Sequence, residues 1–230
     1  MTHDAATAEV RQATDDFEDL VHGLMCAGDP RVRRLGPAGT APDLMAARLR
    51  AAETSSWTMH VEMSVRFLMR ARSVTTARTD VPDVRTLAPR AVVDHAPLYA
   101  QVHPELRVAP VPLPLLLTDA RHVLLTGPPG TDDADTVWES SDPRVVGDAT
   151  DLFLLLFRGS RHWSEVSDRP RLGPRTVAVA LRLCEGAGDQ EIAAELGTSQ
   201  RTVSAEVHTL VEWTGARSRT QAVAILAGLG

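Results

Sequence analysis

The segment from residue 189 to residue 203 has the residue types and the spacing of two short helices joined by a tight turn. Ile192 and Leu196 stand four positions apart, which is typical of the buried side of a short helix. Gly197 allows a tight turn after that helix, and Ser199 can cap a second helix. Two short helices joined in this way form a helix-turn-helix, whose second helix enters the major groove of DNA. The segment therefore predicts contacts with DNA.

The second helix of this motif carries the side chains that we expect to contact DNA. Arg201 and Thr202 stand in its first turn, where side chains and backbone N–H groups can hold a phosphate. Ser204, Ala205 and His208 stand on the side that we expect to face the base edges. The predicted DNA-binding residues are Ser199, Gln200, Arg201, Thr202, Ser204, Ala205 and His208.

The composition excludes several catalytic chemistries. All 24 residues counted as Lys or Arg are Arg, so the chain has no lysine. A P-loop needs a lysine on the phosphates, and a Schiff-base enzyme needs a lysine amine. Cys26 and Cys184 stand too far apart to indicate a metal-binding motif or a disulfide framework. We therefore expect no enzymatic activity, no metal site and no cofactor.

Two histidine patterns have some of the residue types of a metal or ligand site. His60 and Glu62 stand two positions apart on one face of a predicted strand, but the sequence places no further metal ligands beside them. His95 and His103 flank Tyr99 at four-residue spacings, which fits ordinary packing or a surface position and also fits a contact with a ligand. Neither pattern predicts a site on its own.

Four successive helices over residues 173–230 would position the DNA-binding motif. They are expected at residues 175–184, 190–196, 198–213 and 220–229. Gly215 ends the third helix, and the residues from Ser218 to Gln221 form a capping box for the last one. Residues 173–230 are therefore expected to form an all-α four-helix helix-turn-helix domain.

The preceding residues mix helical and strand-like patterns. Helices are expected at residues 5–27, 43–52, 65–72 and 149–163. Short apolar runs that favour strands are found at residues 57–63, 84–87, 91–93, 106–111, 113–118, 122–126 and 136–139. This mixture predicts an α/β or α+β regulatory domain over residues 1–163. The polar stretch at 164–172, which contains Pro170, predicts an interdomain linker.

Four separated pieces of the C-terminal region resemble the LuxR-type, GerE-like DNA-binding domain. They are Leu172–Thr176, Asp189–Gly197, Ser199–Val203 and Gly215–Val223, in the order and at the spacing of that family. The resemblance covers residues 170–230. It implies a four-helix domain in which the third helix reads DNA and the fourth often mediates dimerisation.

Three positions of the third predicted helix depart from that family. Ser204 stands where the family usually has a basic residue, Glu206 where it often has histidine, and Trp213 where a basic residue is common. Glu206 and Glu212 are expected to face or approach phosphates and so to weaken binding. Residues 169–230 hold seven Arg against six Asp and Glu, which is a small positive excess for a DNA partner. The alternative is a degenerate motif that serves only in protein contacts.

A LuxR-type C-terminus implies an N-terminal sensor or regulatory domain, and three families can be compared with residues 1–163. A phosphoacceptor receiver needs an acidic pair after a strand and a lysine, whereas Asp15 and Asp16 lie on a predicted helix and lysine is absent. An acyl-homoserine-lactone pocket is typically rich in Trp and Tyr, whereas the chain has one tyrosine, Tyr99. The receiver is therefore rejected, and the lactone pocket stays an alternative.

The interpretation that we favour is a domain similar to phospholipase D. The resemblance rests on the segments 84–87, 106–109, 114–119 and 122–126, followed by a helix with Phe153, Phe157 and Trp163. The catalytic pattern of that superfamily includes a lysine, so such a domain would be inert in this chain. It could only bind an effector, either a small molecule or a protein, or dimerise.

These features predict a cytoplasmic, bacterial, sequence-specific transcription regulator that binds double-stranded DNA as a homodimer. The strongly apolar run Leu152–Phe157 is too short to span a membrane. The N-terminal residues lack the basic and apolar regions of a signal peptide. A protein-interaction module is the alternative function.

Overall fold

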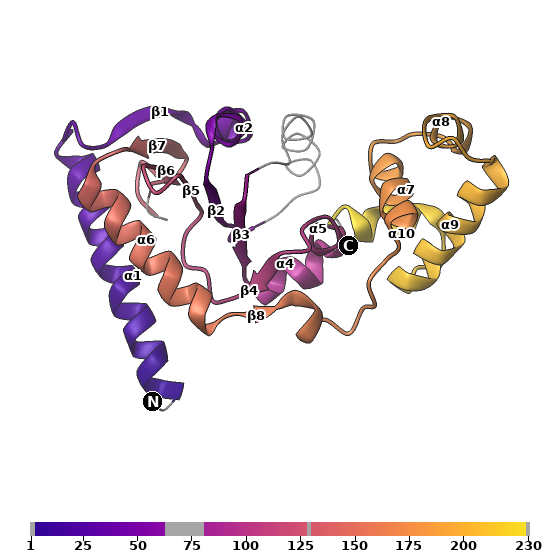
Figure 1. The fold of residues 1–230 in the computed structure, drawn as a ribbon, viewed down its shortest axis with the longest axis horizontal. Helices are drawn as coiled ribbons and strands as arrows, with labels where there is room; N and C mark the ends of the chain where they lie inside the picture. Colours follow the sequence, from indigo (N-terminus) through magenta and orange to yellow (C-terminus); the bar gives the residue numbers. More distant parts are fainter. Residues whose placement is uncertain (1–2, 63–80, 128–129, 229–230) are drawn as a thin grey trace. The chain divides into compact units, whose positions relative to one another are not determined.

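The computed structural model describes residues 3–62, 81–127 and 130–228 of the chain (Figure 1). Its contacts divide these residues into two compact units. The first unit holds residues 3–61, 81–89 and 107–161, and the second holds residue 62, residues 90–106 and residues 162–228. The fold is a mixed α/β fold, as the sequence predicts, and each unit is described here by itself.

The strands of the described residues form one mixed sheet. Its eight strands have the order β1-β7-β6-β5-β2-β3-β4-β8. Their bounds are β1 Arg33–Pro37, β2 Ser55–Met59, β3 Asp83–Ala88, β4 Leu106–Val108, β5 Leu115–Thr118, β6 His122–Thr126, β7 Thr136–Ser140 and β8 Arg161–His162. β2 runs parallel to β3 and antiparallel to β5, and the pairs β5–β6, β6–β7 and β1–β7 are antiparallel.

The β5–β6 hairpin shows why these residues form strands. Apart from His122, both strands are runs of Leu, Val and Thr. Of the three residues that join them, Asp119 and Ala120 have φ angles of 55° and 50°. Positive φ at both central residues is the geometry of a tight hairpin turn that matches the twist of the strands. The predicted strands at 113–118 and 122–126 are confirmed, except that the proline-containing start of the first lies outside β5.

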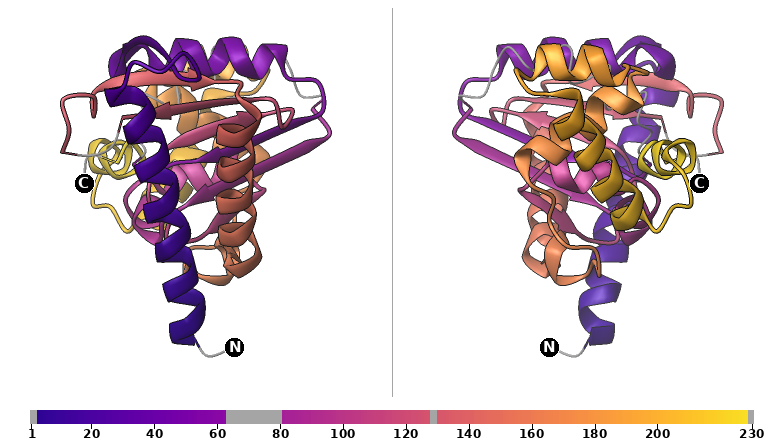
Figure 2. Two further views of the ribbon diagram at one scale, coloured as in Figure 1. Left: turned by 90° about the vertical axis from the view of Figure 1, so that its left-hand side faces the viewer. Right: turned by 90° about the vertical axis from the view of Figure 1, so that its right-hand side faces the viewer.

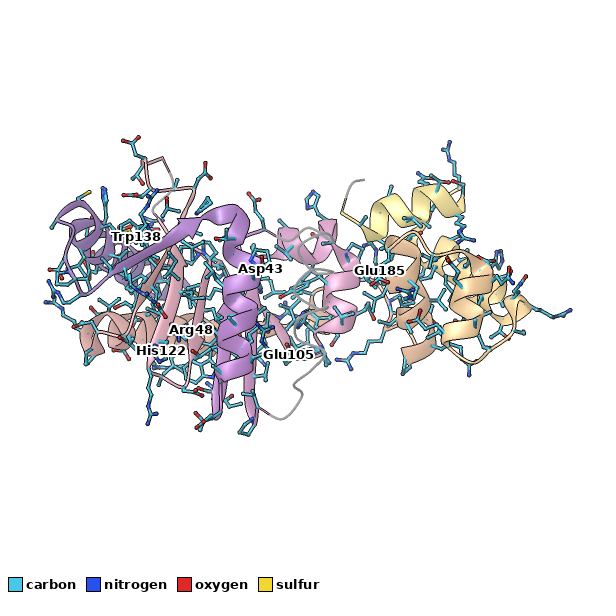
Figure 3. All side chains as sticks on the ribbon, turned by 90° about the horizontal axis from the view of Figure 1, so that it is seen from above. Asp43, Arg48, Glu105, His122, Trp138 and Glu185 are labelled. Atoms are coloured by element: carbon cyan, nitrogen blue, oxygen red, sulfur yellow. The ribbon has the colours of Figure 1, made fainter. Side chains whose placement is uncertain are left out.

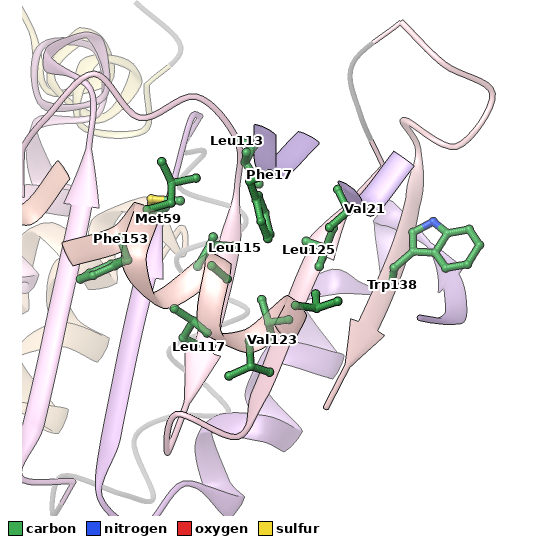
Figure 4. Close-up of a cluster of buried hydrophobic side chains, with 14 of the residues drawn as sticks. Phe17, Val21, Met59, Leu113, Leu115, Leu117, Val123, Leu125, Trp138 and Phe153 are labelled. Carbon is green, nitrogen blue, oxygen red and sulfur yellow. The ribbon is translucent and has the colours of Figure 1, made fainter. Parts of the chain in front are cut away.

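Helices α1 (His3–Cys26) and α6 (Pro143–Gly159) lie side by side on one face of the sheet (Figure 2). Phe17 and Val21 of α1 and Phe153 of α6 are buried with Leu115 and Val123 of the sheet (Figure 4). The other core residues of this face alternate along the strands, as one buried side of a sheet requires. The amphipathic helix predicted at 5–27 is confirmed. The helix predicted at 149–163 instead covers Pro143–Gly159, because Asp142 caps its start and residues 161–162 form β8. The helix predicted at 65–72 lies outside the described residues.

The opposite face of the sheet carries buried polar groups and the helix α2 (Ala41–Ala51). Glu139 of β7 is 6% exposed and forms ion pairs with Arg48 of α2 and with Arg33 of β1. Burial and the nearby Arg48 guanidinium lower the pKa of His122 on β6; Figure 3 labels both residues. Two arginines on one carboxylate compensate the cost of burying that charge.

Asp119, in the hairpin turn, fixes the loop before β2. Its carboxylate accepts hydrogen bonds from the backbone N–H groups of Glu53, Thr54 and Ser55, at 2.7–3.1 Å. Burial alone would raise the pKa of Asp119, but these hydrogen bonds and one from the Thr54 hydroxyl lower it to about 2. The ionised carboxylate therefore has a structural role at this end of the sheet.

The second unit is helical over most of its described residues. Its helices are α4 (Arg90–His95), α5 (Pro97–Val102), α7 (Pro174–Cys184), α8 (Asp189–Glu195), α9 (Gln200–Thr214) and α10 (Arg219–Leu226). Short 3-10 turns occur at Trp163–Glu165 in this unit and at Ala38–Thr40 in the first. The four helices predicted after residue 173 are thus present as α7 to α10.

The N-terminal part of the second unit differs from the expectations. The strand expected at 91–93 is wrong, because Val92, Val93 and Ala96 form the buried side of α4 and of the turn after it. A three-residue apolar run does not distinguish a strand from a helix. α5 packs against α7 and α10. Residues 90–106 therefore cluster with the C-terminal helices, although the predicted domain bounds place them in the regulatory domain.

Candidate nucleic-acid interface

The turn between α8 and α9 has the geometry of two closely joined helices. Ile192 and Ala193 of α8 are buried, and the small side chain of Ala193 permits a close approach. Gly197 has a φ of 60°, a backbone conformation that favours glycine. The Thr198 N–H donates to the Ala193 carbonyl oxygen at 2.9 Å and so ends α8. The glycine and the small residue that the sequence singled out therefore make the turn.

The N-terminus of α9 is capped by the residue predicted for this role. The Ser199 hydroxyl oxygen accepts the Thr202 N–H at 3.1 Å, and it lies 2.9 Å from the Thr202 hydroxyl oxygen. These two side chains are thus engaged with each other. The remaining N–H groups of the first turn have no partner within the helix, which makes this end of α9 attractive to an anion.

Four of the predicted contact residues lie exposed on one side of α9. They are Gln200, Arg201, Ala205 and His208. Arg201 forms neither a hydrogen bond nor an ion pair with any residue that the structure describes, so its guanidinium is available to a phosphate. His208 Nε2 lies 3.2 Å from Glu212 Oε1, one helical turn further along the same side.

Ser204 differs from these four because its hydroxyl has a partner within the unit. It donates to Asp189 Oδ2 of α8 at 3.2 Å, and Arg219 of α10 forms an ion pair with the same carboxylate. Asp189 therefore connects α8, α9 and α10. Ser204 is exposed, but its proton is used inside the bundle, so any contact with DNA would come from its lone pairs.

Glu206 does not lie where the sequence analysis expected it. It is half-buried, and its Oε2 accepts a hydrogen bond of 2.7 Å from the Thr176 hydroxyl of α7. The carboxylate is thus directed toward the neighbouring helix and away from the exposed side of α9. Glu212, in contrast, is exposed on the same side as Arg201 and His208, so only one of the two expected repulsive charges occupies this side.

Trp213 joins α9 to the segment that precedes α7. The indole N–H donates to the Pro170 carbonyl oxygen at 2.8 Å, and the Arg169 guanidinium lies over the indole ring, 5.5 Å from its centroid. The Leu172 N–H donates to Gln101 Oε1 of α5 at 2.9 Å. Residues that were predicted as an interdomain linker thus contact α9 and α5, and no local sequence pattern indicates these contacts.

The remaining candidates from the sequence have local partners. His95 Nδ1 lies 2.8 Å from the Ala91 carbonyl oxygen, and His103 Nδ1 lies 3.0 Å from Glu105 Oε1. Within the described ranges, no group of three or more His, Cys, Asp or Glu residues is arranged to hold a metal ion. In the same ranges, none of the helices combines the length and apolar character that crossing a bilayer demands.

Comparisons with known proteins do not assign a family. No family model and no curated protein match the chain. The similar solved structures include TrmBL2, described as an archaeal chromatin protein with a novel mode of DNA binding, at 13% identity and a TM-score of 0.43. That alignment covers 69% of this chain and 65% of the archaeal protein, which is less than two thirds of its length.

Two bacterial structures are similar over a smaller part of the chain. A phospholipase D family member, Nuc from Salmonella typhimurium, has 17% identity and a TM-score of 0.43, with 56% of this chain and 95% of that protein aligned. NucT from Helicobacter pylori has 10% identity and a TM-score of 0.43, with 57% and 98% aligned. Phospholipase-D-like folds are thus among the structures that this chain resembles, at similarities too low to transfer an activity.

Proposed function

We propose that this protein binds double-stranded DNA through α8 and α9, with α9 in the major groove. The observation that carries the proposal is the exposed side of α9 beside its capped N-terminus. Gln200, Arg201, Ala205 and His208 are exposed there, and Arg201 has no partner among the described residues. An unpaired arginine next to helix N–H groups that have no partner within the helix is suited to a phosphate.

The roles of the individual residues follow from their surroundings. Arg201 contacts a phosphate and positions the helix, while Gln200, Ala205 and His208 face the base edges. Ser199 and Thr202 hold the first turn of α9, and Ser204 ties α9 to α8 through Asp189. In this assignment the main role of Ser199, Thr202 and Ser204 is to position α9.

The finer part of the proposal is a cytoplasmic, sequence-specific transcription regulator of a bacterium. The LuxR-type resemblance of residues 170–230 supports it and implies a homodimer. A two-fold dimer would bind two half-sites about one helical turn apart. The first unit, which resembles phospholipase D in sequence pattern but lacks lysine, would receive the effector.

Gel retardation with the promoter of the protein's own gene tests the proposal at ~50 mM salt, a concentration that favours phosphate contacts. We expect a retarded complex with the wild-type chain, and uniformly weaker binding to all sequences with Arg201→Ala. Gln200→Ala should instead relax the preference for one sequence over another. The absence of any retarded complex at this salt concentration would contradict the proposal.

The alternative is a protein-interaction module. The exposed Glu212 favours it, because a carboxylate on the outer side of α9 repels phosphates and suits a basic protein surface. That function would be supported if a purified regulator protein bound to this chain and the chain had no affinity for DNA.

A further inference from the structure

The segment from Arg169 to Leu172 is held at both ends although it forms neither helix nor strand. Trp213 binds the Pro170 carbonyl oxygen, and Gln101 accepts the Leu172 N–H. Pro170 also restricts the backbone of the segment. A loop fixed in this way presents its side chains with little loss of conformational entropy on binding.

Both arginines of this segment stack on a tryptophan, Arg171 on Trp163 and Arg169 on Trp213, and only Arg169 stands beside α9. Its guanidinium lies over the ring of Trp213, near the C-terminal end of α9, and it is half-buried. No carboxylate within the described part of the chain pairs with it. Stacking on an aromatic ring occupies one face of the guanidinium and leaves the N–H groups at its edge free to donate. Such an arginine is prepared for a bidentate partner, and a phosphate has that geometry.

The position of Arg169 relative to α9 explains what the phosphate would belong to. Trp213 is twelve residues after Arg201, which corresponds to about 18 Å along a helix axis. The major groove of B-DNA is about 12 Å wide. Trp213 stands two helical turns after Glu206, on the side of α9 that faces α7, whereas Arg201 stands on the outer side. Cations on different sides of a helix that lies in the groove can reach phosphates of both strands. Arg169 also offsets the negative end of the helix dipole, which would otherwise repel a phosphate.

We infer that Arg169 is a second DNA-backbone contact, held at the end of α9 by Trp213 and paired across the major groove with Arg201. The inference rests on the proposed function and extends the site to a residue outside the helix-turn-helix. It also accounts for Trp213 at a position where a basic residue would be expected. The positive charge comes from the preceding segment, and the tryptophan positions it.

The salt dependence of DNA binding tests the inference, because log K falls as log salt concentration rises and each phosphate contact adds about 0.9 to the steepness of that fall, here called the slope. Fluorescence anisotropy with a labelled promoter duplex, between ~50 and ~200 mM salt, measures that slope for the full-length chain. Arg169→Gln should lower the slope by about 0.9, and Arg169→Lys should preserve it. Arg201→Ala should lower it by a similar amount and shows that the assay detects one contact.

Arg158→Gln is the matched control, since Arg158 is an exposed arginine of the first unit and the change removes the same charge. It should leave the slope unchanged. Arg169→Met, whose flexible side chain still covers Trp213, provides a second neutral variant if Arg169→Gln lowers the thermal stability.

The outcomes separate this inference from the proposed function. If the wild-type chain does not bind the duplex, the proposed function fails and the inference fails with it. If the wild-type chain binds and Arg201→Ala lowers the slope, an unchanged slope for Arg169→Gln overturns the inference alone. An equal loss in Arg158→Gln would attribute the effect to net charge and would also overturn it.

Discussion

The indole N–H of Trp213 donates a hydrogen bond to the carbonyl oxygen of Pro170, 2.8 Å away and 43 positions earlier in the chain. The bond connects the end of α9 with the segment that precedes α7. Residues 169–172 therefore belong by their contacts to the second unit.

Trp213→Phe should expose the segment to protease while keeping an aromatic ring under Arg169. The loss of one hydrogen bond weakens the local structure by about 1 kcal/mol. Trypsin cleavage after Arg171 should therefore become about fivefold faster, if the segment is cleaved only when it opens. Mass spectrometry of a timed digest measures the rate. Cleavage after Arg158 in the same digest is the internal control, and equal rates at Arg171 in both proteins would contradict the prediction.

Gly197→Ala should destabilise the chain by about 1–2 kcal/mol. The backbone at this position has a φ of 60°, in the left-handed region. An alanine in that conformation is strained by its Cβ, and this strain has that cost even though no atom lies within 4 Å of the added Cβ. Thermal unfolding measures the change. Gly147→Ala is the matched control, because Gly147 lies within α6, an added Cβ meets nothing within 4 Å, and alanine favours a helix interior. The two variants should shift the midpoint in opposite directions.

The local pattern of the chain was sufficient for the elements around the α8–α9 turn but not for their partners. Ile192, Gly197 and Ser199 lie next to one another in sequence, and their spacing predicts the buried side, the turn and the cap. Glu206 accepts a hydrogen bond from Thr176, thirty positions away, and no periodicity contains that information. The orientation of such a side chain depends on packing that forms only in the folded chain.

Short apolar runs were the other weakness of prediction from sequence. Val92 and Val93 fit a strand as well as they fit the buried side of α4, and tertiary packing selected the helix. The same packing places α5 against α7 and α10, which composition cannot show. Long periodic segments such as α1 and α7, in contrast, have enough turns for the 3.6-residue repeat to be decisive.

Tyr99→Ala should destabilise the second unit selectively. Tyr99 is 2% exposed and belongs to α5, so its truncation leaves a cavity and should cost about 3–5 kcal/mol. Hydrogen exchange should show faster exchange of the backbone amides in α7 and α10. Leu156→Ala, at a buried position of α6, is the comparison and should affect the first unit instead. Unchanged protection of α7 and α10 in the Tyr99 variant would show that α5 does not support them.

Asp119→Asn should remove an acid-dependent part of the stability. The pKa of Asp119 is lowered to about 2 in the folded chain, whereas an unfolded aspartate titrates at about 3.9. A lowered pKa stabilises the fold above the unfolded value, and this contribution is lost as the pH falls toward about 2. Asparagine does not titrate, and it tolerates the positive φ of this position.

The difference in unfolding free energy between wild type and Asp119→Asn is the quantity to measure, by urea denaturation at a series of pH values. Wild type should be more stable above pH 4, and the difference should shrink between about pH 4 and pH 2. Taking the difference cancels the titration of the other carboxylates. A difference that stays constant over this range would show that the hydrogen bonds to Glu53, Thr54 and Ser55 do not depend on the charge of Asp119.

Glu212→Gln and Glu206→Gln should have different effects on DNA binding. Both carboxylates were predicted from the sequence to lie near phosphates. In the structure Glu206 accepts a hydrogen bond from Thr176, and of the two only Glu212 is exposed, beside His208. Removing the exposed charge should strengthen binding by about twofold to fivefold, the scale of a surface charge interaction of about 0.5–1 kcal/mol. Glu206→Gln should leave the affinity unchanged, because the amide oxygen can still accept the Thr176 proton and the group faces α7. Anisotropy titrations at one salt concentration compare the two variants, and a larger gain for Glu206→Gln would mean that the side of α9 facing DNA has been assigned incorrectly.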